Sequence, residues 1–187
     1  MLGHSTNILL KVLYLLMFWA RGHIFAPYLH LSHDELITKM KSKLGVKILM
    51  IKVLFICHGN ICRSPMAEFL CKDLVTKRGL ADQVEIASAA TSTEEIGNPV
   101  HRGTVRKLAE YGISAKGKTA RQMTRADYAH YDYLIGMDDW NIRNMMRILG
   151  ADPEQKVHKL LEFAGSDRDI ADPWYTGNFD ETYDDIM

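Results

Sequence analysis

The chain has 187 residues, of which 47% are hydrophobic and 25% are charged. This composition is that of a globular protein, and the length suits one domain better than two. The 23 basic and 23 acidic residues balance, which argues against nucleic acid and an anionic membrane surface as partners.

The N-terminal part differs in character from the rest of the chain. Residues 8–20 are apolar apart from Lys11, and this run is shorter than the about 20 residues that a membrane-spanning helix needs. Its length suits the core of a signal peptide, yet no Lys or Arg precedes it. We interpret it as a short buried helix or as sequence upstream of the true start, with export or anchoring as the alternative. A helix is also predicted at residues 34–43, capped by Ser32 and ended by Gly45.

A regular alternation of strands and helices begins near Met50. Strands are predicted at short apolar, β-branched runs, at residues 51–56, 84–89, 131–137 and 157–163. Helices are predicted at residues 65–78, 100–111 and 139–149, each followed by a glycine. The alternation predicts an α/β domain around a parallel sheet. We place this domain at residues 50–187, with residues 1–49 as an extension that is non-native or forms short helices.

The most specific signal is Cys57-x5-Arg63-Ser64, between the first predicted strand and a helix expected to begin at Pro65. A thiol that attacks a phosphate ester must be ionised, whereas a free cysteine has a pKa of about 8.5. Inward-pointing loop amides and the N-terminus of the following helix supply the positive potential that stabilises a thiolate. Cys57 is therefore the candidate nucleophile, the alternative being a core cysteine at a strand end.

The other loop positions suit the same chemistry. Arg63 offers a planar fork that binds two phosphate oxygens and balances their charge in the transition state. Gly59 lets the backbone approach an anion closely, and Asn60 tolerates a left-handed conformation. The Ser64 hydroxyl can hydrogen-bond the thiolate and help Cys57 to leave in a second step.

The three cysteines, Cys57, Cys62 and Cys71, lie close together in the sequence. An odd, clustered set does not form a disulfide framework and favours a reducing compartment, so we expect a cytoplasmic protein. The paired CxxC motifs of a zinc site are absent, and no metal is expected. Cys71 lies on a predicted helix, where it would pack as a small apolar side chain.

The string from Ile56 to Pro65, ICHGNICRSP, resembles the signature loop of the low-molecular-weight protein-tyrosine phosphatases. Further resembling stretches follow in order: Ala87-Ser88-Ala89, Thr119-Ala120-Arg121-Gln122, Tyr131-Asp132-Tyr133 through Met137-Asp138, and Asp172-Pro173-Trp174-Tyr175. The resemblance covers about residues 50–187. It implies a three-layer α/β domain with a central four-stranded parallel sheet flanked by helices, the phosphotyrosine protein phosphatase I-like fold.

The resemblance also implies an activity and its partners. Phosphotyrosine would be hydrolysed in two steps through phosphocysteine, without a metal or another cofactor. The implied partners are a tyrosine-phosphorylated protein, inorganic phosphate as product, and a cognate tyrosine kinase as a further candidate. By the same resemblance, Ile61 and Cys62 belong to the phosphate-binding loop and Ser88 hydrogen-bonds Asn60, the alternative for Ser88 being an ordinary strand-end serine. His58 lies in the loop beside Cys57, and we expect its side chain to point away from the phosphate, at the rim.

Asp172 precedes Pro173, which biases Asp172 toward an extended backbone. By itself this dipeptide is typical of an ordinary turn. A tyrosine leaving group, with a phenol pKa of about 10, needs a proton as the bond breaks, and such acid catalysis is worth about 10²- to 10⁴-fold in rate. The resemblance assigns this role to Asp172, which later acts as base toward water. Trp174 and Tyr175 would flank the substrate ring at the pocket rim, the alternative being core packing.

Cys62 has a predicted redox role. A thiolate poised for attack is readily oxidised, and a loop that curls round a phosphate would bring Cys62 close to Cys57. The resembled family uses this second cysteine as a resolving thiol that forms a reversible disulfide. The alternative for Cys62 is a small buried side chain.

The chain departs from the family pattern near the loop and at the pocket mouth. Lys116-Gly117-Lys118 stands where many members have a histidine that supports the loop, and Thr93-Glu94-Glu95 stands where an aromatic side chain is common. Two acidic residues at the pocket mouth would favour basic sequence around the target tyrosine. The alternative is a solvated loop.

Three rival functions fit the sequence less well. Arsenate reduction on this scaffold uses a late cysteine pair, and no cysteine follows Cys71. Protein-arginine phosphatases resemble one another in a threonine before the second loop cysteine, where this chain has Ile61. A catalytically silent phosphotyrosine-binding module would not need the set of Cys57, Arg63 and Asp172.

The C-terminal end shows helical spacing of apolar residues over only two turns: Phe179, Tyr183, Ile186 and Met187. The resembled family continues with a full last helix, so the domain is expected to be truncated there. The apolar run at residues 8–20 would then cover core that the missing helix leaves bare, unless the extension is not native.

Overall fold

The computed structural model describes residues 50–187. The apolar run at residues 8–20 and the helix predicted at residues 34–43 lie outside the described residues, so these predictions stay untested. Within the described range, no helix is long and apolar enough to cross a lipid bilayer.

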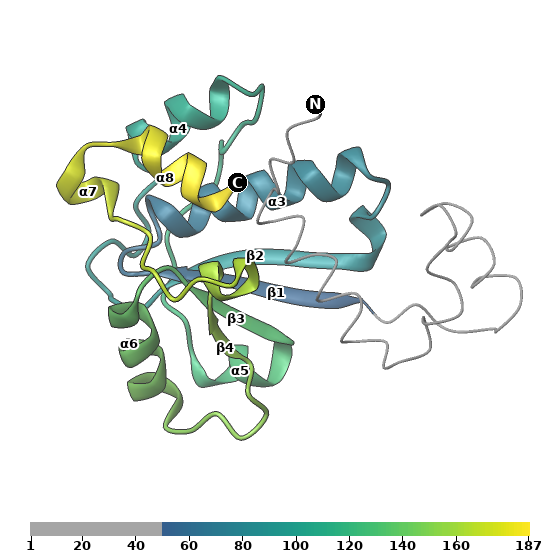
Figure 1. Ribbon diagram of the computed structural model, residues 1–187, viewed down its shortest axis with the longest axis vertical. Coiled ribbons are helices and arrows are strands. Elements are labelled where there is room, and N and C mark those ends of the chain that lie inside the picture. The colour runs from purple at the N-terminus through teal and green to yellow at the C-terminus, as the bar shows by residue number, and fades with distance from the viewer. Residues whose placement is uncertain (1–49) are drawn as a thin grey trace, which may run out of the picture.

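A four-stranded sheet forms the centre of the domain (Figure 1). Its strands are β1 (Ile51–Cys57), β2 (Val84–Ala90), β3 (Tyr133–Gly136) and β4 (Val157–Lys159), in the spatial order β2-β1-β3-β4. All three neighbouring pairs are parallel, which confirms the predicted sheet. Because the strands run the same way, their carboxyl ends meet at one edge: Cys57 pairs with Ala90, and Ile56 pairs with Gly136.

Helices cover both faces of the sheet, which confirms the three-layer architecture (Figure 1). They are α3 (Arg63–Lys77), α4 (Arg102–Ala109), α5 (Arg125–His130), α6 (Asp139–Leu149), α7 (Pro173–Thr176) and α8 (Phe179–Ile186), with short 3-10 helices η2 (Ala81–Gln83) and η3 (Leu160–Ala164). In Figure 1, α3, α4 and α8 lie on one side of the sheet, and α5 and α6 lie on the other.

The central strand β1 contributes to both halves of the core. Val53 and Phe55 pack in the cluster that contains side chains of α3, α4 and α8, whereas Leu54 and Ile56 pack with Met145 of α6. Successive side chains of a strand point to opposite faces. The continuous apolar run that predicted β1 is therefore explained by burial on both faces.

Several predicted boundaries were wrong. The first helix begins at Arg63 rather than Pro65, so Pro65 is its third residue. This position tolerates proline because the first four helical N–H groups have no partner within the helix. The strand predicted at residues 157–163 ends at Lys159, where the chain turns into η3.

Two further predicted elements are shorter in the structure, and the helices α5 and α7 were missed. The predicted helix at residues 100–111 is reduced to α4, since the His101 side chain caps it by accepting the N–H of Gly103. The predicted strand at residues 131–137 is reduced to β3 because the missed helix α5 precedes it, with Thr124 and Asp127 forming a capping box. The predicted two-turn helix at the C-terminal end is confirmed as α8.

Candidate active site

The loop that follows β1 lies where the order of the strands reverses. From β1 the chain passes to β2 on one side, and later to β3 and β4 on the other side. At such a reversal a crevice opens outside the carboxyl ends of parallel strands, and it commonly holds the ligand of the fold. Cys57 ends β1 and Arg63 begins α3, so the connecting loop occupies this crevice.

The loop is folded with its carbonyl groups turned outward. The carbonyl oxygens of Cys57, His58 and Ile61 accept backbone hydrogen bonds from residues of the 91–101 segment at 2.9 to 3.0 Å. Asn60 adopts the left-handed conformation that its side chain was expected to tolerate, with φ of 56°. A loop whose carbonyls face outward presents its amides inward, and such concave amide arrays bind anions.

Cys57 is almost completely buried, with 3% of its surface exposed. Its sulfur lies 3.1 Å from the hydroxyl oxygen of Ser64, at the start of α3. The expected hydrogen bond from Asn60 to Ser88 is present at 2.7 Å, and Asn60 also donates to Ser64 at 2.8 Å. Ser88 therefore supports the loop from β2.

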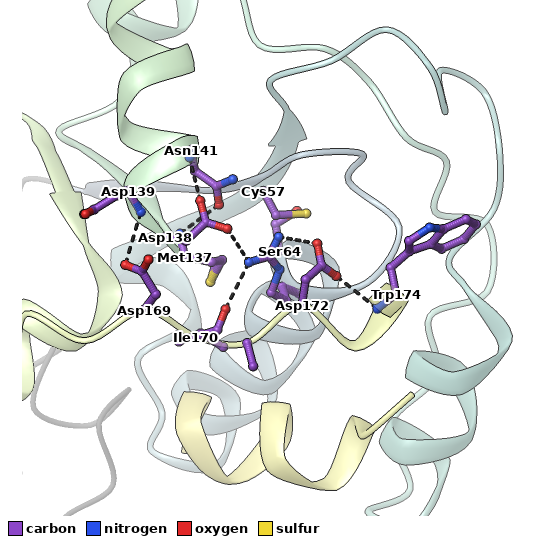
Figure 2. Close-up of polar contacts among 12 residues, drawn as sticks. Cys57, Ser64, Met137, Asp138, Asp139, Asn141, Asp169, Ile170, Asp172 and Trp174 are labelled. Atoms are coloured by element: carbon purple, nitrogen blue, oxygen red, sulfur yellow. Dashed lines mark hydrogen bonds and ion pairs between the residues drawn. The ribbon is translucent and has the colours of Figure 1, made fainter. Parts of the chain in front are cut away.

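The guanidinium group of Arg63 is buried between two carboxylates (Figure 2). Its Nη1 donates to Asp138 Oδ2 at 2.5 Å and to the carbonyl oxygen of Ile170 at 3.0 Å. Its Nη2 donates to Asp172. Burial acts to lower the pKa of Arg63, but the negative charges of Cys57, Asp172 and Asp138 outweigh it and raise the pKa. The arginine therefore stays charged.

Asp138 is a site residue that sequence reasoning did not assign, although it lay in a resembling stretch. It follows β3 and caps α6, where its Oδ1 accepts the N–H of Asn141 at 2.6 Å. Its other oxygen holds Arg63. The sequence signal that could have identified Asp138 is its position directly after a predicted strand of the parallel sheet, because the carboxyl ends of parallel strands meet at the edge where Cys57 lies.

Lys159 holds the segment before α7 against the start of α6. Lys159 is the last residue of β4, and its ammonium group contacts the carboxylates of Asp139 at 2.8 Å and Asp169 at 3.0 Å. The backbone N–H of Asp139 also donates to Asp169 at 3.1 Å. These contacts keep Ile170 and Asp172 beside Arg63 (Figure 2).

Asp172 has the extended backbone expected before proline, with φ of −82° and ψ of 114°. It caps the short helix α7, since its Oδ1 accepts the N–H of Trp174 at 3.1 Å (Figure 2). Its Oδ2 accepts the bond from Arg63. The carboxylate thus lies in the wall of the same pocket as Cys57.

A pocket of about 110 Å³ opens above Cys57. It is lined by Cys57, His58, Gly59, Ile61, Cys62, Glu94, Glu95, Asp172, Trp174 and Tyr175. Trp174 and Tyr175 are 56% and 83% exposed, which rules out the alternative that they are core residues. In residues 50–187, no group of three or more His, Cys, Asp or Glu side chains is arranged to hold a metal ion.

The pocket mouth carries the two acidic residues singled out in the sequence. Glu94 Oε2 lies 2.9 Å from His58 Nε2, so the His58 side chain points to the rim. Glu95 packs against the loop, because a Cβ added to Gly59 would lie 3.0 Å from Glu95 Cγ. Gly59 thus permits close approach of the 91–98 segment as well as of an anion.

The three cysteines are free thiols and are all buried. Burial, reinforced by negative charge at Cys57, raises the pKa of Cys62 to about 12. Burial raises the pKa of Cys71 to about 12, and Cys71 packs in the core as expected for a small apolar side chain. Both are therefore neutral thiols at physiological pH.

Comparison with known proteins identifies relatives over the described domain. A family model described as low molecular weight phosphotyrosine protein phosphatase matches residues 52–187. The chain is 45% identical over 134 residues to the low molecular weight protein-tyrosine-phosphatase YfkJ of Bacillus subtilis (strain 168), covering 71% of this chain and 86% of the relative. The crystal structure of YfkJ has a TM-score of 0.71 at 44% identity, covering 73% of this chain and 87% of that one.

Two further solved structures are similar. SP-PTP, a low molecular weight protein tyrosine phosphatase from Streptococcus pyogenes, has a TM-score of 0.64 at 41% identity and covers 72% of this chain and 84% of its own. The YwlE arginine phosphatase, in a mutant with a phosphorylated active-site serine, has a TM-score of 0.63 at 27% identity and covers 73% and 86%. With the family model matched over most of the chain, the protein belongs to the low-molecular-weight phosphotyrosine protein phosphatase family.

Proposed function

We propose that the chain hydrolyses phosphotyrosine in proteins through a phosphocysteine intermediate, with Cys57, Arg63 and Asp172 as the reacting and phosphate-binding groups. The observation that carries this proposal is their convergence. The sulfur of Cys57 and the carboxylate of Asp172 line one pocket, and Arg63 is hydrogen-bonded to that same carboxylate. Nucleophile, acid and phosphate clamp are thus within reach of a single ester.

In the first step the Cys57 thiolate attacks phosphorus. A sulfur–phosphorus bond forms as the bond between phosphorus and the tyrosine oxygen breaks. Protonated Asp172 gives its proton to that oxygen, so that tyrosine leaves as a neutral phenol. The inward amides of the loop and Arg63 bind the phosphoryl oxygens and stabilise the charge that they carry in the transition state.

In the second step water attacks the phosphocysteine. The Asp172 carboxylate takes a proton from the water, the oxygen–phosphorus bond forms, and Cys57 leaves as a thiolate. Ser64, at 3.1 Å from the sulfur, can donate a hydrogen bond to it. Inorganic phosphate is the product, and Asp172 is again protonated for the next turnover.

Arg63 is arranged so that one edge can bind phosphate. Asp138 and the carbonyl of Ile170 both hold Nη1, while Nη2 is bonded only to Asp172 and Nε has no hydrogen-bond partner among the described residues. The Nε and Nη2 edge can take two oxygens at once. A bound phosphate would then replace Asp172 on Nη2 and free the carboxyl group for proton transfer.

Trp174 and Tyr175 suit a flat aromatic substrate. Both are exposed and both line the pocket next to Asp172. Aromatic side chains contact a phenyl ring over a large area. A phosphotyrosine ring held between them would place its ester oxygen near the acid. A cognate tyrosine kinase as partner stays a prediction.

Phosphoarginine is the second candidate substrate, because the similar YwlE structure is that of an arginine phosphatase.

Hydrolysis of para-nitrophenyl phosphate tests whether the chain is an active enzyme rather than a binding module. Matched peptides that carry phosphotyrosine or phosphoarginine then test the substrate. We expect efficient phosphate release from phosphotyrosine alone; efficient release from phosphoarginine alone would overturn the assignment.

A further inference from the structure

A buried polar cluster lies behind the loop. We call it the back cluster and define it as the side chains of Asn60, Ser64, Glu68, Ser88 and Lys118. Asn60, Ser64, Glu68 and Ser88 are buried, and none of the five is among the residues that line the pocket. Lys118 belongs to the stretch at which the sequence departs from the family pattern. The cluster therefore joins the loop to α3, to β2 and to this departing stretch.

The hydrogens of the back cluster can be assigned one by one. The side-chain oxygen of Asn60 accepts the backbone N–H of Arg121 at 3.3 Å, which fixes the orientation of the amide. The Asn60 Nδ2 atom therefore donates its two hydrogens, to Ser64 at 2.8 Å and to Ser88 at 2.7 Å. The Ser88 hydroxyl donates its own hydrogen to Glu68 Oε2 at 2.5 Å, since an ionised carboxylate can only accept.

Ser64 is left with one hydrogen to donate. Its oxygen lies 3.1 Å from the sulfur of Cys57 and 3.4 Å from the carbonyl oxygen of Ala89. An ionised sulfur is the nearer and the charged acceptor, and hydrogen bonds to charged groups are the stronger ones. The assigned hydrogens thus direct the Ser64 hydroxyl toward a Cys57 thiolate.

The assignment of the Ser88 hydrogen holds only while Glu68 is ionised. Burial acts to raise the pKa of Glu68, but the charge of Lys118 and the hydrogen bonds from Lys72, Ser88 and Lys118 outweigh it and lower the pKa. If Glu68 were protonated, its O–H would compete with Asn60 for the Ser88 oxygen, and the Ser88 hydrogen would lose its acceptor. Ser88, which accepts a hydrogen bond from Asn60, would then no longer be held in place by its own bond to Glu68.

Two lysines contact Glu68, and they are not equivalent. Lys72 binds Oε1 at 2.5 Å, from the exposed side of α3 with 44% of its side chain exposed. Lys118 binds Oε2 at 2.9 Å with 15% of its side chain exposed, and Oε2 is the oxygen that accepts from Ser88. Lys118 also donates to the carbonyl oxygen of Ser88 at 3.1 Å. Lys118 is therefore the better shielded partner, and it holds Ser88 directly through the carbonyl oxygen and indirectly through Glu68.

We propose that Lys118 is a positioning residue for phosphoryl transfer: its charge keeps Glu68 ionised, so that Ser88 and Asn60 leave the Ser64 hydroxyl to donate to the Cys57 thiolate. Lys118 acts through the network and touches neither substrate nor sulfur. The inference rests on the proposed function, since it takes Cys57 as the nucleophile.

Lys118→Met tests the inference, with Lys118→Arg as the charge-preserving variant and Lys116→Met as the matched control in the same stretch. We expect Lys118→Met to lower kcat by about three- to tenfold, the effect of one lost hydrogen bond to the sulfur, with KM little changed. The rate at which iodoacetamide alkylates Cys57 should fall by a similar factor at acidic pH and by less as the pH is raised, because a hydrogen bond to the sulfur favours its ionised form. Lys118→Arg should restore both rates, and Lys116→Met should behave as the parent.

The pH profile of alkylation separates positioning from a merely structural role. If Lys118→Met lowers the melting temperature but leaves the alkylation profile and kcat as in the parent, Lys118 only holds its loop and the inference is overturned. A double variant with Ser88→Ala provides a second criterion. If Lys118 acts through Ser88, the two effects on the acidic alkylation rate are not additive; additive effects would contradict the proposed route.

The inference and the proposed function can fail separately. Turnover that survives in Cys57→Ser would remove the nucleophile and with it both proposals. Loss of turnover in Cys57→Ser together with a parent-like Lys118→Met would remove only the role of Lys118.

Discussion

The two sides of the loop between β1 and α3 differ in how their polar side chains are hydrogen-bonded. On the pocket side, Asp172 and Arg63 are paired with each other, and the phosphate binding proposed above would separate this pair. Behind the loop, the hydrogens of Asn60 and Ser88 each have an acceptor in the back cluster. In this comparison, the groups proposed to react are joined by a hydrogen bond that a substrate would replace. The supporting groups are joined by hydrogen bonds that stay in place.

The two carboxylates that contact Arg63 also differ in their position relative to the pocket. Asp138 is fixed at the start of α6 by its bond to Asn141. Asp172 likewise accepts the N–H of Trp174 and caps α7, but unlike Asp138 it lines the pocket. We therefore assign Asp138 to holding the arginine and Asp172 to proton transfer, and the variants below test this division.

Cys57→Ser should have the largest effect. A hydroxyl has a far higher pKa than a thiol and is not ionised by this loop, so turnover of para-nitrophenyl phosphate should be abolished. The fold and the anion site should remain, and inorganic phosphate should still raise the melting temperature. Turnover close to that of the parent would disprove covalent catalysis by Cys57.

Asp172→Ala should have the second largest effect on turnover. We expect kcat to fall by about 10²-fold or more for phenyl phosphates with a poor leaving group, because the departing oxygen is no longer protonated. Esters with an activated leaving group need no proton and should lose less. A leaving-group series for parent and variant measures this, and equal losses across the series would take the acid role away from Asp172.

Asp138→Asn should have an intermediate effect that does not depend on the leaving group. The amide can still accept the N–H of Asn141 but no longer pairs its charge with Arg63, so we expect kcat/KM to fall roughly tenfold. Asp73→Asn removes a surface ion pair with Lys77 on α3 and serves as control. A leaving-group dependence like that of Asp172→Ala would show that the two carboxylates are not divided as assigned.

Glu94→Gln combined with Glu95→Gln should have the smallest effect, and only on charged peptides. For phosphotyrosine peptides with flanking Lys or Arg, kcat/KM should fall about two- to fivefold, as expected for exposed charge pairs. The loss should shrink as salt is added, and para-nitrophenyl phosphate should be unaffected. Glu154→Gln, at a surface pair with Lys156, is the control. No change with basic peptides would mean that the acidic mouth does not select substrates.

The sequence by itself was sufficient for the parts of the site that are contiguous in the chain. β1, the loop and the start of α3 follow one another, so Cys57, Asn60, Arg63 and Ser64 could be placed by their spacing and chemistry. The apolar run of β1 likewise predicted a strand buried on both faces. Asp172, which is 109 residues from Arg63, was reached only through the family resemblance.

The tertiary structure alone decided which distant charged residues belong to the site. Asp138, Glu68 and Lys118 are residue types that usually lie on the surface, and of the three only Asp138 carries a signal in the sequence, its place just after a predicted strand. They reach the loop because parallel strands bring their carboxyl ends to one edge and because α3 packs Glu68 against β2. Such contacts depend on the arrangement of strands in space, which local periodicity does not contain.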